Sequence, residues 1–248
     1  MKHIFLVIRS VILWAISGIH FVIFCLFLML LAVFIDPRKH DWLQRLFFRN
    51  ILRLIGVKLE VRCSPGFDPK RTSIFISNHV NLFDPFVVYS SIPQFFRGFE
   101  LESHFKIPVY GWLMKRFGNV PVPADPSRSG LEEMIRRAKH AIDSGISLIA
   151  FAEGSRTRNG HVGPFRKGIF RIAQNFGCPI VPMSIVGSFE FFRTGHWMIH
   201  PGRITVYLHD IIETNGTSRK GLDDLRMRVH AIVSKPVEDA MKESSGEN

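Results

Sequence analysis

The segment TSIFISNHVNLFDP at residues 72–85 begins with a short β-rich run, TSIFIS, and continues directly into polar residues. From residue 58 onward, similar short runs alternate with segments of helical periodicity. This alternation is typical of a mainly parallel sheet flanked by crossover helices, so we predict an α/β fold. The other predicted strands are residues 58–63, 118–122, 146–151, 180–186 and 204–209.

Four segments of the body have the apolar spacing of helices. Residues 41–55 form an amphipathic pattern in which Arg45, Arg49 and Arg53 follow one another in a row, as on a helix at a membrane surface or on an ordinary solvated face. A second helix is predicted over 126–145 with Asp125 as its cap. A third should follow Gly168, and the last should run from Gly221 until Pro236 interrupts it.

The N-terminal segment is a membrane candidate. Residues 11–35 contain no charged side chain, and a helix of that length is long enough to cross a bilayer core of about 30 Å. A re-entrant hairpin bent at Ser17-Gly18 is the alternative. Asp36-Pro37 ends the segment under either interpretation. The basic residues that follow, between 38 and 53, outnumber Lys2 and Arg9, so the catalytic body should lie on the cytoplasmic face of the membrane.

These patterns divide the chain into three parts. Residues 1–57 are the predicted membrane anchor and interfacial helix, residues 58–242 the α/β domain, and residues 243–248 a disordered tail. The formal net charge of +11 favours an anionic membrane as partner. We predict no nucleic-acid partner, because no nucleic-acid-binding motif accompanies the charge. Three scattered cysteines indicate a reducing compartment.

A histidine with a nearby carboxylate follows the strand at 72–77. In open parallel sheets, reactive groups lie just beyond the carboxyl ends of strands, and His79 is in such a position. Asp84 can hydrogen-bond one nitrogen of the His79 imidazole only if the turn between them is irregular, since a regular helix would separate the two side chains. With that bond made, His79 can act as a general base.

A second polar segment, FAEGSRTRNG, follows the predicted strand at 146–151. Its small residues can expose backbone and hydroxyl donors, and the guanidinium of Arg156 suits a phosphate group. Arg166 and Lys167 add two cations where the next predicted helix begins, and a helix N-terminus itself favours anions.

Together the two segments resemble the glycerolipid acyltransferase family, which contains 1-acyl-glycerol-3-phosphate acyltransferases. Its NHxxxxD block is matched by Asn78, His79 and Asp84, and its FPEGTRS block by FAEGSRT at residues 151–157. The resemblance covers roughly residues 73–186. It implies an α/β acyltransferase domain in which His79 deprotonates the acceptor hydroxyl and Asp84 orients His79. It also implies an acceptor phosphate site formed by Glu153, Gly154, Ser155, Arg156 and Lys167.

Two further blocks of the family fit unequally. The strand containing Val181 and Pro182 resembles the family's fourth block, which implies a role for both residues in acyl binding. The second block departs from the pattern, because the strand at 118–122 has no arginine close behind it and Arg128 is the nearest. Arg128 is therefore a weaker candidate for the phosphate site. His196 and His200 lack an accompanying HExxH motif, and we predict neither a metal nor a cofactor.

The predicted reaction is transfer of a fatty acyl group from acyl-CoA or acyl-carrier protein to the 2-hydroxyl of 1-acyl-glycerol-3-phosphate, which forms phosphatidate. The partners are then a lysophospholipid acceptor, an acyl thioester donor and the membrane. Another lysophospholipid, an ornithine lipid or glycerol 3-phosphate is an alternative acceptor. A non-catalytic basic membrane-binding protein is the alternative of a different class.

Overall fold

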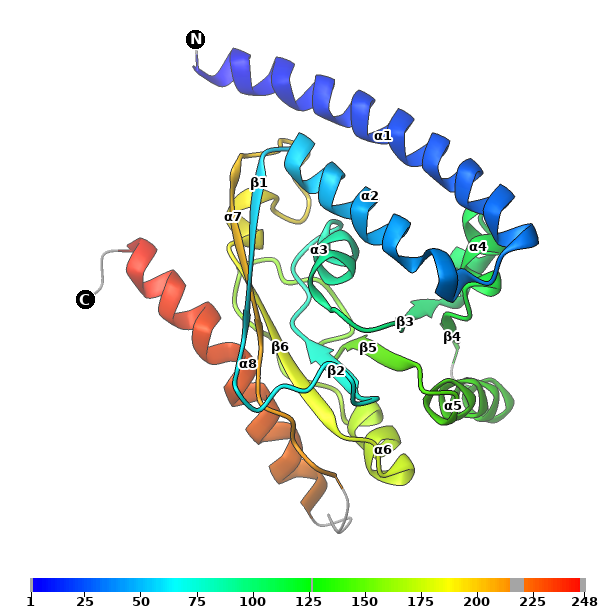
Figure 1. Cartoon of the computed structure of the whole chain (residues 1–248). Helices are drawn as coiled ribbons and strands as arrows, with labels where there is room; N and C mark the ends of the chain where they lie inside the picture. The colour runs from blue at the N-terminus through cyan, green and yellow to red at the C-terminus, as the bar shows by residue number, and fades with distance from the viewer. Residues whose placement is uncertain (1, 126, 215–220, 246–248) are drawn as a thin grey trace.

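The computed structural model describes residues 2–125, 127–214 and 221–245, and these fold around one seven-stranded sheet (Figure 1). The strand order is β1-β7-β6-β2-β5-β3-β4, and every neighbouring pair is parallel except β6 with β7. The predicted fold, a mainly parallel sheet flanked by helices, is confirmed. The strands are β1 Val57–Cys63, β2 Ile74–Ser77, β3 Phe96–Leu101, β4 Val120–Val122, β5 Ser147–Phe151, β6 Ile180–Val186 and β7 Gly202–Leu208.

The strand order determines where the site forms. β2 lies between β5 and β6, and Ser77 at its end is in register with Phe151 and Met183. The carboxyl ends of these parallel strands therefore meet at one edge of the sheet, and the loops that follow β2 and β5 are neighbours there.

Helices cover both faces of the sheet (Figure 1). α2 (Asp41–Leu54) and α3 (Asp84–Ser91) pack on one face, where Phe75 and Val181 are fully buried. On the other face, α5 (Arg128–Asp143), α6 (Lys167–Phe176) and α8 (Leu222–Ser245) pack over the alternate side chains of the same strands. The shorter elements are 3₁₀ turns η1 Pro37–His40 and η2 Glu102–Lys106, and helices α4 Tyr110–Arg116 and α7 Ser188–Phe191.

α1 (Lys2–Phe34) is one continuous helix, so of the two alternatives the hairpin bent at Ser17-Gly18 is wrong. It is long and apolar enough to cross a membrane. However, it packs lengthwise on the body. In its first half Trp14 Nε1 donates to the Trp197 carbonyl at 2.7 Å, and near its C-terminal end the Ala32 carbonyl accepts a hydrogen bond from Arg116 Nε at 2.8 Å.

Two predicted details of the helices were wrong, and one strand was missed. Ser127, in place of Asp125, caps α5, because its Oγ accepts the Gly130 N–H at 3.2 Å. β3 had not been predicted from the sequence. α8 continues through Pro236 to Ser245, beyond the start of the predicted disordered tail at residue 243. Pro236 deprives the helix of one hydrogen bond, but the buried Val233 and Val237 on either side hold the helix against the sheet. Pro126 and residues 246–248 lie outside the described residues.

The arginines of α2 have different surroundings. Arg45 forms an ion pair with Asp41 at 2.8 Å and donates to the Gln94 carbonyl at 2.7 Å. Arg49 donates to the Ser90 carbonyl at the end of α3 at 3.1 Å. Arg53 is exposed. Two members of the predicted surface stripe therefore also join α2 to the rest of the fold.

Candidate active site

The His79 imidazole is hydrogen-bonded to Asp84 at the carboxyl end of β2. Residues 78–83 form an irregular turn, and Asp84 is the first residue of α3. The turn allows the His79 Nδ1 to lie 2.7 Å from the Asp84 Oδ2, a contact that a regular helix would not permit at this spacing. The pairing predicted from the sequence is therefore present.

Asp84 is fully buried and held by several donors. Its Oδ2 also accepts the backbone N–H groups of Val80 at 2.5 Å and Asn81 at 3.0 Å, while its Oδ1 accepts the Ser188 hydroxyl at 3.3 Å. With Nδ1 bonded to this fixed carboxylate, the imidazole keeps Nε2 for a substrate proton.

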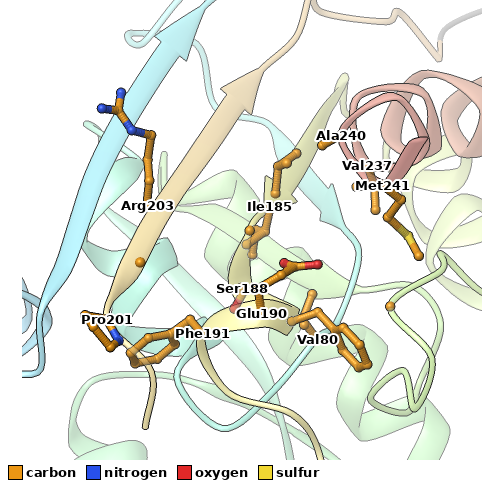
Figure 2. A pocket seen from close by; sticks show the side chains of 15 residues that line it. Val80, Ile185, Ser188, Glu190, Phe191, Pro201, Arg203, Val237, Ala240 and Met241 are labelled. Atoms are coloured by element: carbon orange, nitrogen blue, oxygen red, sulfur yellow. The ribbon is translucent and has the colours of Figure 1, made fainter. Parts of the chain in front are cut away.

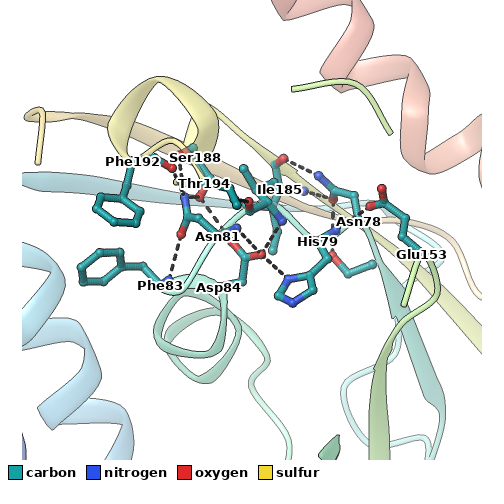
Figure 3. Close-up of polar contacts among 12 residues, drawn as sticks. Asn78, His79, Asn81, Phe83, Asp84, Glu153, Ile185, Ser188, Phe192 and Thr194 are labelled. Carbon is teal, nitrogen blue, oxygen red and sulfur yellow. Dashed lines mark hydrogen bonds and ion pairs between the residues drawn. The ribbon is translucent and has the colours of Figure 1, made fainter. Parts of the chain in front are cut away.

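Two asparagines fix the turn to its neighbours, as Figure 3 shows. Asn78 bonds the backbone of Ile185 in both directions, donating to its carbonyl at 2.9 Å and accepting its N–H at 2.8 Å. Asn81 donates to the carbonyls of Ser188 at 2.7 Å and Phe192 at 2.9 Å. The position of His79 is thus set by β6 and the segment after it.

Glu153 joins the loop after β5 to the His79 turn (Figure 3). Its Oε1 accepts the His79 backbone N–H at 2.7 Å, and its Oε2 accepts the Gly163 N–H at 2.8 Å. Burial raises the pKa of Glu153, and these two hydrogen bonds oppose the rise. Both carboxylate oxygens are engaged by backbone groups, so Glu153 acts on the site through the position of His79.

The cations near this loop differ in what they contact. Gly154 adopts a positive φ of 70°, and the Arg166 guanidinium packs so closely on it that a Cβ there would lie 2.6 Å from Nε. Arg156 is exposed, and among the described residues it forms no ion pair. Lys167 forms an ion pair with Asp223 at 2.8 Å. The guanidinium groups of Arg166 and Arg156, more than the ammonium of Lys167, are therefore left for a ligand.

Arg128 lies apart from this group. It is 93% exposed at the start of α5 and bonds Glu132 at 3.0 Å. β3 and β4 lie beyond β5 in the sheet, so the helix that follows β4 begins away from the His79 turn. A role for Arg128 in phosphate binding stays a prediction, as do the roles of the other predicted site residues.

Residues 58–186, just over half of the chain, match the sequence model of the acyltransferase family. The chain belongs to the acyltransferase family. The crystal structure of the 1-acyl-sn-glycerophosphate (LPA) acyltransferase from Thermotoga maritima has the same fold, with a TM-score of 0.81 at 22% identity over 96% of this chain and 97% of that one.

Curated relatives of this acyltransferase are 1-acyl-sn-glycerol-3-phosphate acyltransferases. A chloroplastic one from Brassica napus is 32% identical over 137 residues, which are 55% of this chain and 39% of that protein. One from Haemophilus influenzae is 25% identical over 196 residues, 79% of this chain and 81% of that protein. The chain spans about two fifths of the length of the Brassica relative.

A mainly apolar cavity of about 240 Å³, whose lining also includes Glu190 and Arg203, adjoins the His79 turn of the acyltransferase (Figure 2). Val80 lies at its wall beside Ile185 of β6, and α8 contributes Val237, Ala240 and Met241. Val181 and Pro182, the predicted acyl-binding residues, are buried in the interior of the same strand. They support the strand, and the later residues of β6 reach the cavity.

Sequence reasoning missed several residues that hold the site of this acyltransferase. Asn81 and Ser188 bond each other and Asp84, yet they are 107 residues apart and no local pattern joins them. Arg166 was recognised only as a cation at a helix start. The glycine at position 154 was the one sequence feature that could have pointed to this contact, because a residue without a side chain leaves room for the Arg166 guanidinium.

Proposed function

We propose that this acyltransferase moves a fatty acyl group from a thioester to the 2-hydroxyl of 1-acyl-glycerol-3-phosphate and so forms phosphatidate. One observation carries the proposal: the imidazole of His79 is oriented by a buried carboxylate and tied through Glu153 to a loop with exposed guanidinium groups. The names of the curated relatives support the same acceptor.

The reaction begins when Nε2 of His79 takes the proton of the acceptor hydroxyl. The alcohol oxygen then attacks the thioester carbonyl carbon, and the imidazolium that forms is stabilised by Asp84. The tetrahedral intermediate collapses with cleavage of the carbon–sulfur bond. The thiolate leaves, and the proton held by His79 returns to it. Base catalysis of this kind contributes about 10²- to 10⁴-fold in rate.

The acceptor phosphate binds beside the loop at 153–157 in this proposal. Arg156 and Arg166 supply the positive charge, and a guanidinium can bond two phosphate oxygens at once. The exposed Gly154 and Ser155 allow the phosphate to approach the backbone. Lys167 has a secondary role because Asp223 already neutralises it.

The hydrocarbon chain is placed in the apolar cavity next to Val80. The cavity wall is mainly aliphatic and aromatic. Because the cavity adjoins the turn that contains His79, an acyl chain bound in it would lie near the catalytic imidazole. The donor is acyl-CoA or acyl-carrier protein, and no cofactor takes part. The enzyme works at the membrane, with its catalytic body on the cytoplasmic side.

The proposal is tested with the purified full chain in neutral detergent. A panel of lysophosphatidate, other lysophospholipids, a lyso-ornithine lipid and glycerol 3-phosphate is offered with each thioester donor, and products are identified by mass spectrometry. We expect phosphatidate as the main product and its loss, by at least about 100-fold, in His79→Ala. An unchanged rate of thioester consumption in that variant, or no turnover with any acceptor by the native chain, would refute the mechanism.

A further inference from the structure

A second cavity, of about 380 Å³, lies between the C-terminal part of α2, the first part of β1 and the end of α3. It shares no lining residue with the cavity beside His79. Ser90, at its wall, is six residues beyond Asp84, which corresponds to about 9 Å along α3. The cavity is therefore separate from the proposed catalytic site. Its lining residues are Arg49, Leu52, Arg53, Val57, Lys58, Leu59, Val61 and Ser90.

The cavity carries positive charge without a compensating carboxylate. Three of its lining residues, Arg49, Arg53 and Lys58, are cationic and none is acidic. Within the described part of the chain, none of these three side chains forms an ion pair. Glu60, the acid of β1, is bound by Arg62 at 2.8 Å and by Arg203 at 3.1 Å. An anion entering the cavity would meet no repelling group in the lining.

Ser90 adds a buried hydroxyl that needs a partner. The residue is 1% exposed, and its Oγ has no hydrogen-bond partner among the described residues. The Ser90 carbonyl, in contrast, accepts two hydrogen bonds from the Arg49 guanidinium. The Ser90 Oγ is not accessible from the cavity, so a ligand with acceptor oxygens would bond the cations.

The surface beside the cavity is apolar and exposed, which suits a lipid. On α2, Trp42 and Leu46 are 61% and 46% exposed, and they lie on the same face of the helix as Arg49 and Arg53. The exposed apolar face of α1 is close by, because Arg9 of α1 donates to the Ile55 carbonyl at 3.4 Å where α2 ends. A headgroup phosphate in the cavity would leave its acyl chains beside apolar side chains.

We propose that this cavity binds the phosphate of an anionic phospholipid that is neither acceptor nor product of the reaction. Arg53 and Lys58 supply positive charge to the headgroup. Arg49 also supplies charge, and its hydrogen bonds to the Ser90 carbonyl connect the site to α3. The apolar face of α2 contacts the acyl chains. The site would hold the C-terminal end of α2 at the headgroup level of an anionic membrane. The proposal is independent of the catalysed reaction.

The test is a binding titration of the full chain in neutral detergent. The probes are short-chain phosphatidylglycerol, short-chain phosphatidylcholine and inorganic phosphate. Arg53→Glu is compared with Lys70→Glu, which makes the same charge change at an exposed residue outside the cavity. Arg166→Ala identifies any binding at the catalytic loop. Far-UV circular dichroism and melting temperature show that the variants are folded.

We expect phosphatidylglycerol to bind more tightly than the other two probes, and Arg53→Glu to weaken its binding about tenfold while Lys70→Glu leaves it unchanged. Equal affinities in the two charge-reversal variants would overturn the proposal. Equal binding of inorganic phosphate would show a site for a free ion, and equal binding of phosphatidylcholine a site that does not select anionic lipid; either result also overturns it. Turnover plays no part in these measurements, so a failure of the proposed function would be seen separately.

Discussion

Single residues decide which cations near His79 can bind a substrate phosphate. Two cations that are adjacent in sequence have very different partners. Lys167 forms an ion pair with Asp223, whereas Arg166 packs on Gly154, in the loop that also positions His79. A carboxylate already bound to a cation reduces the attraction of that cation for another anion. The position of a cation along the chain is thus a poor guide to its role.

At the residue scale we predict that Arg166→Ala raises the KM for lysophosphatidate by about 10- to 100-fold with a smaller change in kcat, because a charge-assisted hydrogen bond contributes about 1.5–3 kcal/mol. The matched variant Lys167→Ala should change KM by less than about fivefold, since it removes an exposed ion pair. Steady-state kinetics at saturating donor measure both. A larger effect for Lys167→Ala than for Arg166→Ala would place the phosphate on the Lys167 ammonium and contradict this prediction.

At the scale of elements, the site depends on two loops that follow neighbouring parallel strands. Glu153 holds the loop after β5 to the turn after β2, and the Thr157 N–H donates to the His79 carbonyl at 2.9 Å in the same junction. β2 and β5 are 70 residues apart in sequence but adjacent in the sheet, so the junction exists only in the folded chain.

We predict that Glu153→Gln lowers kcat by about 10- to 100-fold. The amide has one acceptor oxygen where the carboxylate has two, so one buried N–H, of His79 or Gly163, loses its partner at a cost of about 1–3 kcal/mol. Kinetics and melting temperature are measured together. If the variant kept full kcat, the backbone contact of Glu153 would have no part in positioning His79.

The sequence was sufficient for the elements with strong local patterns. The strands around Ile76 and Ile149 are apolar runs, and the motif residues follow them directly, so the fold and the His79–Asp84 pair could be predicted. β3 could not, because Arg97, the second residue of the strand, and Glu100 interrupt its apolar pattern. In the structure Arg97 is fully buried, stacked 3.7 Å from the centre of the Phe95 ring. Long-range contacts such as Asn78 with Ile185 leave no local signal.

At the scale of the whole molecule, α1 forms an additional layer on the body. Its inward side chains contact the fold from Ser10, whose Oγ accepts the Ile199 N–H at 3.1 Å, to Ala32. Its other face is apolar and exposed over nearly the whole helix, for example at Ile4, Ile19 and Leu30, which are 64%, 64% and 61% exposed. A helix of 33 residues is about 50 Å long, which exceeds a bilayer core of about 30 Å.

These contacts predict that α1 lies along the membrane surface, since a perpendicular crossing would pull one end away from the body. Single cysteines at Ile4, Ile19 and Leu30, in a chain whose native cysteines are replaced, can carry spin labels in reconstituted vesicles. We expect similar, shallow depths at all three positions, with Glu132→Cys on α5 as the water-exposed control. A deep label at position 19 between shallow labels at positions 4 and 30, with position 4 reached by an impermeant reagent only from the opposite side, would establish a spanning helix. In that case the contacts of Trp14 and Ser10 with the body would have to break when the protein enters the membrane.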